Sequence, residues 1–435
     1  MASNTSNKFW NIILTAAAVV FFIGTFVLIQ YSDIYISPDG TANAFFAKQY
    51  SDTGTLKFFD QINVDLDDHV FPRSIIAKDG YYLPISFLGL PVLYGSFLYI
   101  FGDGILNFIT PILAILAVFA FHKIITRIFN KEIANISALL LFFHPAFWYY
   151  SARGLMHNVL FSTLLIFSAY FILITPIKLH LKKCENTIGK IKTWQTKIDL
   201  VVSGLLVGLA LFVRTSEVYW VIGLIFFLFI ILRKNINKTD IFIFLIGIVI
   251  GVLPVLIMNN HTYGDPLISG YTMGMGDVEV STVSIDSSVM SYLFPFGIHP
   301  RTAIKHMSDY GFALFWWLSI FVFAGIPVVQ LKEKQSKQNK RLIYTVVFLL
   351  LAVWLGFWYG SWIIFDNPDR TQLTLARSYI RYWLPVFIMS IPFIAGFILW
   401  ISDKSKSIFS KKIFTATLML LLVGLNINVT FFNGQ

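Results

Sequence analysis

The stretch 240-DIFIFLIGIVIGVLPVLIMN-259 has no charged residue between Asp240 and Asn259, and it decides the fold class. A helix needs about 20 apolar residues to cross the hydrocarbon core of a bilayer. Similar apolar runs fill most of the chain, at 9–30, 84–101, 104–128, 133–150, 155–176, 198–214, 216–233, 311–331, 342–363, 381–402 and 412–431. The alternating short strands of a membrane barrel do not occur, so these runs must satisfy their backbone as helices. The sequence therefore predicts an all-α polytopic membrane protein.

The composition agrees with this fold class. Of the 435 residues, 57% are hydrophobic and only 13% are charged, whereas a soluble domain has about 25% charged residues. The single Cys184 excludes an internal disulfide framework. A net charge of +10 can indicate a nucleic-acid partner, but basic residues in a membrane protein mark cytoplasmic loops. We therefore expect membrane lipids around the chain and no nucleic acid.

Basic residues predict the topology. Most of the 33 Lys and Arg residues fall in five loops, at 122–132, 177–197, 233–238, 331–342 and 403–412. Two apolar runs separate each of these loops from the next, so all five lie on one side, which the positive-inside rule makes cytoplasmic. The first run, 9–30, is longer than the core of a signal peptide and no small-residue cleavage site follows it. We interpret it as a retained membrane anchor.

The run 84-PISFLGLPVLYGSFLYIF-101 sets the number of spans. It contains two prolines and two glycines, and aromatic residues lie near its ends. If it lies in the outer interface or is re-entrant, the N-terminus and all five basic loops are cytoplasmic. We therefore predict about 11 transmembrane helices, an interfacial helix at 84–101 and further helices in the extracytoplasmic loops. The alternative is twelve spans with an extracytoplasmic N-terminus.

This topology makes residues 1–435 a single transmembrane domain with two large extracytoplasmic loops, 31–103 and 260–310. In the first loop, Asp39 follows the first anchor and begins a segment with the pattern of an amphipathic helix. The acidic stretch 60-DQINVDLDDH-69 is interpreted as a solvated loop, although its oxygens could bind a hard cation. The segment 277–286 could gate a substrate or simply link two elements.

Charged residues recur where helices meet the outer face, namely Arg153, His157, Arg214, Glu217, Arg377 and Arg381. An ionisable residue at a span is costly and usually faces a cavity or a partner. Arginine recognises phosphate with two parallel hydrogen bonds, and a carboxylate such as Asp39 can act as a general base. The pattern favours chemistry on a phosphorylated substrate at the outer face. The alternative is that the arginines reach to the interface or pair with acids such as Glu217.

Four stretches carry a resemblance to a known family, namely 39-DGTANAFFAKQYSDTG-54, 81-YYLPISFLGLPVLYGSFLYIFG-102, 259-NNHTYGDPLISGY-271 and 381-RYWLPVFIMSIP-392. They resemble, in order, the first outer loop, the proline-rich juxtamembrane helix, a later Asn and Tyr-Gly-x-Pro segment, and the late Arg-Tyr helix of the GT-C superfamily. This superfamily of membrane glycosyltransferases includes protein O-mannosyltransferases and aminoarabinose transferases. The resemblance covers most of the chain.

The resemblance implies an enzyme that passes a sugar from a polyprenyl-phosphate carrier to a protein, lipid or glycan acceptor, with inversion at the anomeric carbon. Asp39 would be the base, and Arg153, Arg214 and Arg381 would hold the lipid phosphate. The further substrate-binding candidates are His157, Glu217, Tyr263 and Arg377. In 153-RGLMH-157 the family often has a second acid where this chain has His157, which weakens a paired-carboxylate site. No cofactor is predicted, and a divalent metal is left open.

Two other functions are weighed against the transferase. A transporter or flippase of lipid-linked glycans would place its ionisable residues near the middle of the bilayer, whereas here they lie at outer helix ends. A non-enzymatic scaffold would not need an acid facing several arginines. We therefore expect a multi-pass protein of the cell membrane, with a cytoplasmic N-terminus and an extracytoplasmic active site.

Overall fold

The computed structural model describes residues 2–28, 35, 37–153, 155–174, 187–232, 237–274, 294–331, 335–364, 372–404 and 407–433. The segment 277–286 and parts of four predicted basic loops lie outside these residues. The chain forms two compact units, which are described separately. Unit 1 comprises Met1–Leu28, Ile115–Ala152 and Asp286–Gln435, and unit 2 comprises Ile29–Ala114 and Arg153–Ile285. The single transmembrane domain stays a prediction.

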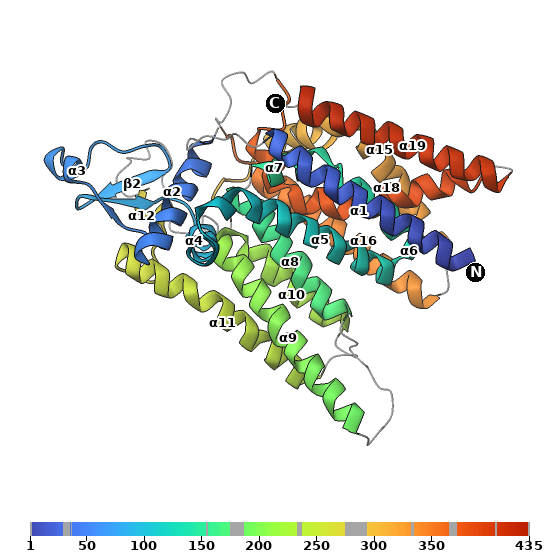
Figure 1. The fold of residues 1–435 in the computed structure, drawn as a ribbon, viewed down its shortest axis with the longest axis horizontal. Coiled ribbons are helices and arrows are strands. Elements are labelled where there is room, and N and C mark those ends of the chain that lie inside the picture. The colour runs from blue at the N-terminus through green and yellow to red at the C-terminus, as the bar shows by residue number, and fades with distance from the viewer. Residues whose placement is uncertain are drawn as a thin grey trace. The chain divides into compact units, whose positions relative to one another are not determined.

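Long apolar helices confirm the all-α polytopic membrane fold (Figure 1). Within the described residues, 8 helices are long and apolar enough to cross a membrane, or 9 if one bent pair counts as a single span. The predicted runs 155–176 and 216–233 appear as shorter apolar helices. The predicted number of 11 spans therefore stays a prediction, as do the orientation of the termini and the side of each loop.

Unit 1 is a helical bundle. Its elements are α1 (Ala2–Leu28), the later part of α5 (Leu106–Ile128), α6 (Lys131–Phe142), α7 (Pro145–Ala152), α14 (Pro300–His306), η3 (Met307–Phe312), η4 (Ala313–Phe315), α15 (Trp316–Val328), α16 (Gln335–Gly360), α17 (Ser378–Tyr382), α18 (Leu384–Ser402), α19 (Ile408–Asn428) and η5 (Val429–Asn433). Helix α18 packs on α15 and α6. At the α15 contact, a Cβ on Gly325 would lie 2.1 Å from the carbonyl oxygen of Phe393. A glycine is therefore what lets these two backbones approach.

A break divides the predicted run 133–150. Helices α6 and α7 meet at 50°. Pro145 begins α7, and at this first position its missing N–H costs no intrahelical hydrogen bond. The proline also disfavours helical geometry in His144, the residue before it. Every residue of α7 is buried, and Trp148 packs its ring on Phe21 and Phe143. The proline thus ends one helix and redirects the chain through the core of unit 1.

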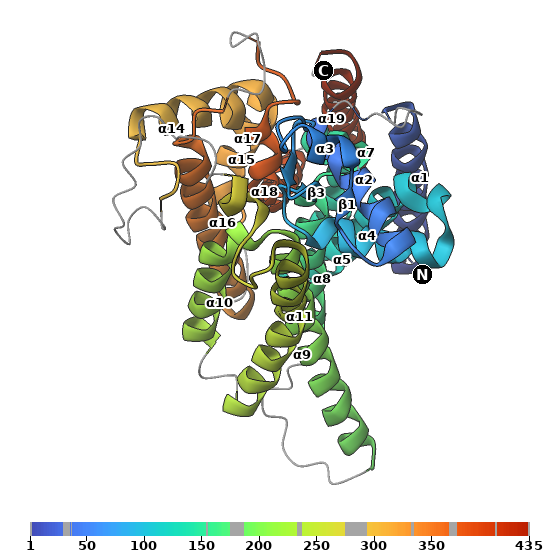
Figure 2. The same ribbon diagram turned by 90° about the vertical axis from the view of Figure 1, so that its left-hand side faces the viewer.

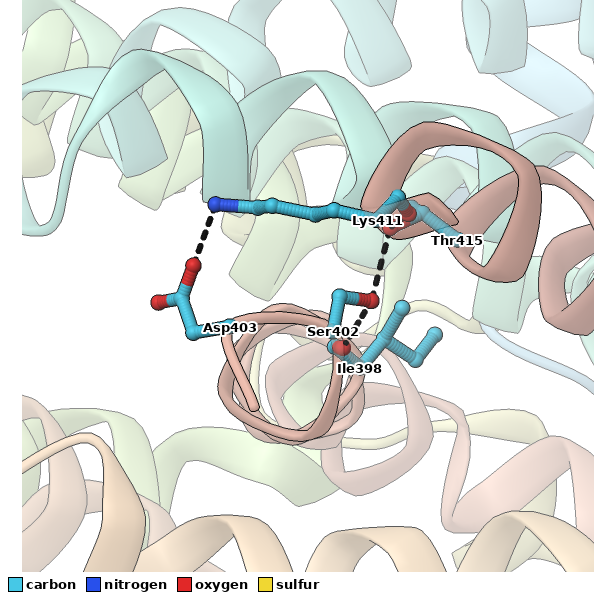
Figure 3. Close-up of polar contacts among 5 residues, drawn as sticks. All are labelled: Ile398, Ser402, Asp403, Lys411 and Thr415. Carbon is cyan, nitrogen blue, oxygen red and sulfur yellow. Dashed lines mark hydrogen bonds and ion pairs between the residues drawn. The ribbon is translucent and has the colours of Figure 1, made fainter. Parts of the chain in front are cut away.

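The predicted basic loop 403–412 joins α18 to α19, and side chains on both helices close the turn (Figure 3). The Lys411 ammonium pairs with the carboxylate of Asp403. Thr415 donates to the hydroxyl of Ser402 at 2.7 Å, and Ser402 donates to the carbonyl of Ile398 at 2.8 Å. A basic residue of this loop thus pairs with an acid at the adjoining helix end.

Unit 2 combines helices with one small sheet (Figure 2). Its elements are α2 (Pro38–Thr53), β1 (Phe58–Phe59), α3 (Gln61–Asp65), β2 (Ile75–Lys78), β3 (Tyr81–Pro84), α4 (Gly89–Phe101), η1 (Asp103–Ile105), the start of α5, α8 (His157–Ile174), α9 (Thr187–Val213), η2 (Thr215–Glu217), α10 (Val218–Leu232), α11 (Lys238–Tyr263) and α12 (Gly270–Gly274). The sheet is antiparallel, in the order β1-β3-β2. The sheet was not predicted from the sequence, because strands of two to four residues are too short to show an alternating pattern.

Helices α9 and α11 pack through two pairs of glycines. Gly204 and Gly208 of α9 face Gly247 and Gly251 of α11, at the same four-residue spacing on both helices. A Cβ on Gly247 would lie 2.3 Å from the carbonyl oxygen of Val201. Small residues at this spacing let two helix backbones meet, which is how membrane helices associate without a hydrophobic driving force.

We expect Gly247→Ala to destabilise unit 2 by about 1–3 kcal/mol, because the added methyl forces two rigid backbones apart. The matched control is Gly223→Ala in α10, where no atom lies within 4 Å of the new Cβ. Thermal unfolding of the detergent-solubilised protein measures both. Equal melting temperatures for the two variants would show that the α9–α11 contact tolerates separation.

The run 84–101 divides into the last residue of β3, a short connection and helix α4. The helix has 13 residues, which at 1.5 Å per residue is about 20 Å and too short for a hydrocarbon core of about 30 Å. Helix α4 packs on α2, with Gly95 against the carbonyl oxygen of Ala47. This length agrees with a helix that does not span, and its interfacial location stays a prediction.

Candidate functional site

Asp39 lies in the first turn of α2. Ser37 precedes the helix in extended geometry and Pro38 occupies its first turn, where proline's fixed φ suits a helix start. The exposed N–H groups and the dipole at a helix N-terminus stabilise a carboxylate there. Ser74 donates its hydroxyl to Oδ1 of Asp39 at 2.6 Å. The predicted base is thus half-buried, lies in the first turn of a helix and accepts a hydroxyl from a distant loop.

Asn43 fixes the same face of α2, one turn after Asp39. Its side chain is buried and is hydrogen-bonded at both ends. Nδ2 donates to the carbonyl of Leu155 at 2.8 Å, and Oδ1 accepts from the hydroxyl of Ser86 at 2.9 Å. Asn43 was not predicted as a site residue, although its position four residues after Asp39 places both side chains on one helix face.

The segment 84–89, which connects β3 to α4, gathers three of the predicted site residues. Tyr263 donates its hydroxyl to the carbonyl of Pro84 at 2.7 Å, and Nε2 of His157 lies 2.9 Å from the carbonyl oxygen of Phe87. The guanidinium of Arg214 stacks over the Phe87 ring at 6.0 Å from its centroid, at the edge of cation–π range. His157, Arg214 and Tyr263 therefore share one partner segment, to which α2 is tied through Ser86.

Two glycines allow the backbone to approach this segment closely. A Cβ on Gly89 would lie 2.4 Å from the carbonyl oxygen of Phe212, and one on Gly270 would lie 2.3 Å from that of Pro84. Phe212 lies two residues before Arg214, and Gly270 begins α12. Contacts this close between backbones can be made only by glycine, and they fix the 84–89 segment against both neighbours.

Arg214 and Glu217 form a buried ion pair. Nη2 of Arg214 lies 2.7 Å from Oε1 of Glu217, and Nε donates to the same oxygen at 2.9 Å. Trp220 donates its indole N–H to Oε2 of Glu217. Both charged side chains are buried, so the pairing foreseen as the alternative role is confirmed for Arg214. The pair is neutral overall, and each partner compensates the burial of the other.

The remaining predicted arginines are less closely tied to this group. Arg153 is half-buried and is the first residue of Arg153–Ile285, the second chain segment of unit 2. Arg377 and Arg381 belong to unit 1, so their approach to Asp39 stays a prediction. Arg377 is buried and precedes α17, and its carbonyl accepts the hydroxyl of Tyr150 at 3.0 Å.

Arg381 belongs to an aromatic cluster of unit 1. Its guanidinium stacks over the Tyr382 ring at 5.2 Å from the centroid. The Tyr382 ring in turn stacks on Tyr359 at 4.4 Å and on Trp362 at 5.9 Å. The aromatic residues of this cluster were not predicted, since they come from separate segments and only the fold brings them together.

Two acids of the stretch 60–69 accept hydrogen bonds from backbone N–H groups, one within the stretch and one beyond it. Asp60 caps α3 by accepting from the N–H of Ile62 at 3.0 Å, and Asp68 accepts from the N–H of Gly80 at 3.0 Å. The pKa of the Tyr82 phenol is raised above its usual value. Desolvation is the larger cause, and the nearby Asp60 carboxylate is the second. Within the described part of the chain, no three His, Cys, Asp or Glu side chains form a group that could hold a metal ion.

Comparison with solved structures identifies the fold. The oligosaccharyltransferase of Archaeoglobus fulgidus, tethered to an acceptor peptide containing the NVT sequon, matches with a TM-score of 0.60 and 13% identity, over 98% of this chain and 56% of that one. The same archaeal enzyme, AglB, in complex with an inhibitory peptide and a dolichol-phosphate matches with a TM-score of 0.58 and 13% identity, over 99% and 57%. The apo form of ArnT from Cupriavidus metallidurans matches with a TM-score of 0.48 and 10% identity, over 98% and 74%.

The chain thus spans little more than half the length of the archaeal enzyme. No protein-family model matches it, and no curated protein matches it significantly in sequence. At 13% identity the likeness concerns the fold alone. The resemblance inferred from sequence is thus borne out at the level of the fold, which this chain shares with a membrane oligosaccharyltransferase.

Proposed function

We propose that this chain is a membrane glycosyltransferase that takes a sugar from a polyprenyl-phosphate donor and attaches it, with inversion, to an acceptor on the extracytoplasmic face. The observation that carries the proposal is the fixed carboxylate of Asp39, held at the start of α2 by Ser74. Asn43 ties the same helix to Ser86 and Leu155. The choice of reaction is supported by the fold shared with an oligosaccharyltransferase, one structure of which is a complex with a dolichol-phosphate.

In the proposed reaction, Asp39 accepts the proton of the acceptor hydroxyl or amide as that group attacks the anomeric carbon. A new bond forms between the acceptor and this carbon, while the bond from the carbon to the phosphate oxygen breaks. The polyprenyl phosphate leaves with the electron pair and an added negative charge. Arg153 is the proposed cation for this charge within unit 2, because guanidinium groups match phosphate oxygens in geometry. Arg377 and Arg381 of unit 1 stay candidates from the sequence.

Arg214 has a different proposed part. Its charge is compensated by Glu217, and its guanidinium lies over Phe87 in the 84–89 segment. We propose that the Arg214–Glu217 pair, with His157 and Tyr263, shapes the substrate-binding wall, and that another arginine supplies the positive charge. His157 contacts the backbone carbonyl of Phe87. A histidine N–H can donate to a carbonyl oxygen, so this role does not require a second carboxylate.

The competing function is a transporter or flippase of lipid-linked glycans. A flippase needs no base, and its polar groups would line a path through the bilayer centre. Arg214 follows the last residue of α9 and Arg377 precedes the first residue of α17. Charged groups at helix ends favour chemistry at a membrane surface over a path through the membrane.

One assay separates the two functions. The purified protein is reconstituted in vesicles with undecaprenyl- or dolichyl-phosphate sugars that carry a radioactive label in the sugar, and an extract of the producing cell's envelope supplies acceptors. We expect the label to move into material that is no longer extracted with the lipid. Label that changes leaflet while remaining on the lipid would contradict the transferase and identify a flippase.

A further inference from the structure

The loop that brings Ser74 to Asp39 has an unusual backbone. The N–H of Ile75 donates to the carbonyl of Pro72 at 3.2 Å, which closes a four-residue turn. Ser74 is the third residue of this turn, with φ at +71°. A positive φ at this position is typical of a type II turn and favours glycine or asparagine, because a Cβ is poorly tolerated there. The chain places a serine where glycine would be less strained.

The hydroxyl of Ser74 gives a reason for this choice. It donates to Oδ1 of Asp39 at 2.6 Å, across 35 residues of sequence. That length falls in the range of strong hydrogen bonds between a hydroxyl and a carboxylate. Glycine would satisfy the backbone but could not make this bond. Strained residues tend to persist where the surrounding structure and the function require them.

The small sheet holds the turn in place. Ile75 begins β2 directly after Ser74, and β2 pairs with β3 in the register Ile75↔Pro84. The carbonyl of Pro84 accepts the hydroxyl of Tyr263, at the end of α11. The position of Ser74 is therefore fixed through the sheet to the 84–89 segment, and so to the same frame that holds α2 through Ser86.

We propose that Ser74 is a positioning residue for Asp39, and that the three-stranded sheet serves to present its hydroxyl to that carboxylate. A bond to one oxygen fixes the rotation of the carboxylate about its Cβ–Cγ bond, and so orients the group toward the acceptor. This inference rests on the proposed role of Asp39 as the base.

The decisive variant is Ser74→Gly, which removes the hydroxyl and relieves the backbone. If Ser74 were only a turn residue, this change would leave transfer unaltered or improve it. We expect kcat to fall about 10- to 100-fold, as for other lost hydrogen bonds to charged groups, with the KM for the labelled lipid donor unchanged. Ser74→Asn should recover part of the rate, because asparagine tolerates a positive φ and can donate an N–H.

Two controls keep the inference separate from the proposed function. The melting temperature of Ser74→Gly should stay close to that of the wild type, because the relieved backbone offsets part of the lost hydrogen bond. Thermal stability should also show coupling between Ser74→Gly and Asp39→Ala in a double-mutant cycle, in which each variant removes one partner of the hydrogen bond and no substrate is required. Additive effects in that cycle would overturn the inference whatever the reaction is.

The kcat values of Asp39→Asn, Ser74→Gly and Ser74→Asn then decide between the inference and the proposed function. If Asp39→Asn abolishes transfer while Ser74→Gly keeps the wild-type kcat, Ser74 does not position the base and only this inference fails. If Asp39→Asn keeps the wild-type rate, the assigned base is wrong and the inference falls with it. A reduced kcat in Ser74→Gly, partly recovered by Ser74→Asn, supports the inference.

Discussion

Asp39→Asn lowers the kcat of sugar transfer by about 100- to 10,000-fold, the contribution expected of a general base. The amide keeps the size of the carboxylate and can still accept the hydrogen bond of Ser74, but it cannot take a proton from the acceptor. Binding of the lipid donor should change little, because the proposed phosphate partners are arginines. Initial rates with labelled polyprenyl-phosphate sugar, together with a binding isotherm for that lipid, measure both quantities.

The matched control for this variant is Asp52→Asn, in the same helix. Asp52 is exposed near the end of α2, so its variant should transfer sugar at the wild-type rate. If both variants lose activity equally, the effect belongs to the charge of the helix and not to a base. A wild-type rate in Asp39→Asn would remove Asp39 from the mechanism.

Glu217→Ala has the largest expected effect on stability. It leaves the Arg214 guanidinium buried without its carboxylate and removes the acceptor of the Trp220 indole N–H. Removing one partner of a buried ion pair costs about 3–5 kcal/mol. We expect the melting temperature of the detergent-solubilised protein to fall by several degrees, with loss of transfer as the wall around Phe87 is disturbed.

The double variant Arg214→Met/Glu217→Gln is the control for charge. It removes both charges, keeps an amide oxygen for Trp220 and roughly preserves volume, so it should be more stable than Glu217→Ala. Replacing a whole buried pair is often nearly neutral, whereas orphaning one partner is not. If the double variant melts below Glu217→Ala, the stability of this region does not depend on the neutrality of the pair.

The sequence was sufficient to predict the membrane bundle, because uncharged apolar runs of this length are typical of membrane-spanning helices. It was also sufficient to predict the helix after Asp39 and to distinguish the run 84–101 from the spanning helices. The sheet between them escaped prediction, since its strands are too short for a periodic signal. The break at Pro145 lay inside a run that reads as continuous, although proline itself was a visible signal.

The candidate site was predictable in its residue types and less so in its contacts. His157, Arg214 and Tyr263 were chosen from the sequence as substrate-binding candidates, and the structure shows all three in contact with one segment, 84–89. Ser74 gave no sequence signal, because its bond to Asp39 crosses 35 residues and depends on a turn and a strand pairing. Long-range contacts of this kind arise only once the chain is folded.

The stereochemistry of the transferred sugar is the most direct test of Asp39 as the base of a sugar transferase. Nuclear magnetic resonance of the product distinguishes the two anomers and can be compared with the donor of known configuration. We expect inversion, because a base that activates the acceptor gives a single displacement at the anomeric carbon, whereas a carboxylate nucleophile gives a covalent intermediate and retention. A product with the donor's configuration, or no new glycosidic bond at all, would contradict the assignment of Asp39 as the base of a sugar transferase.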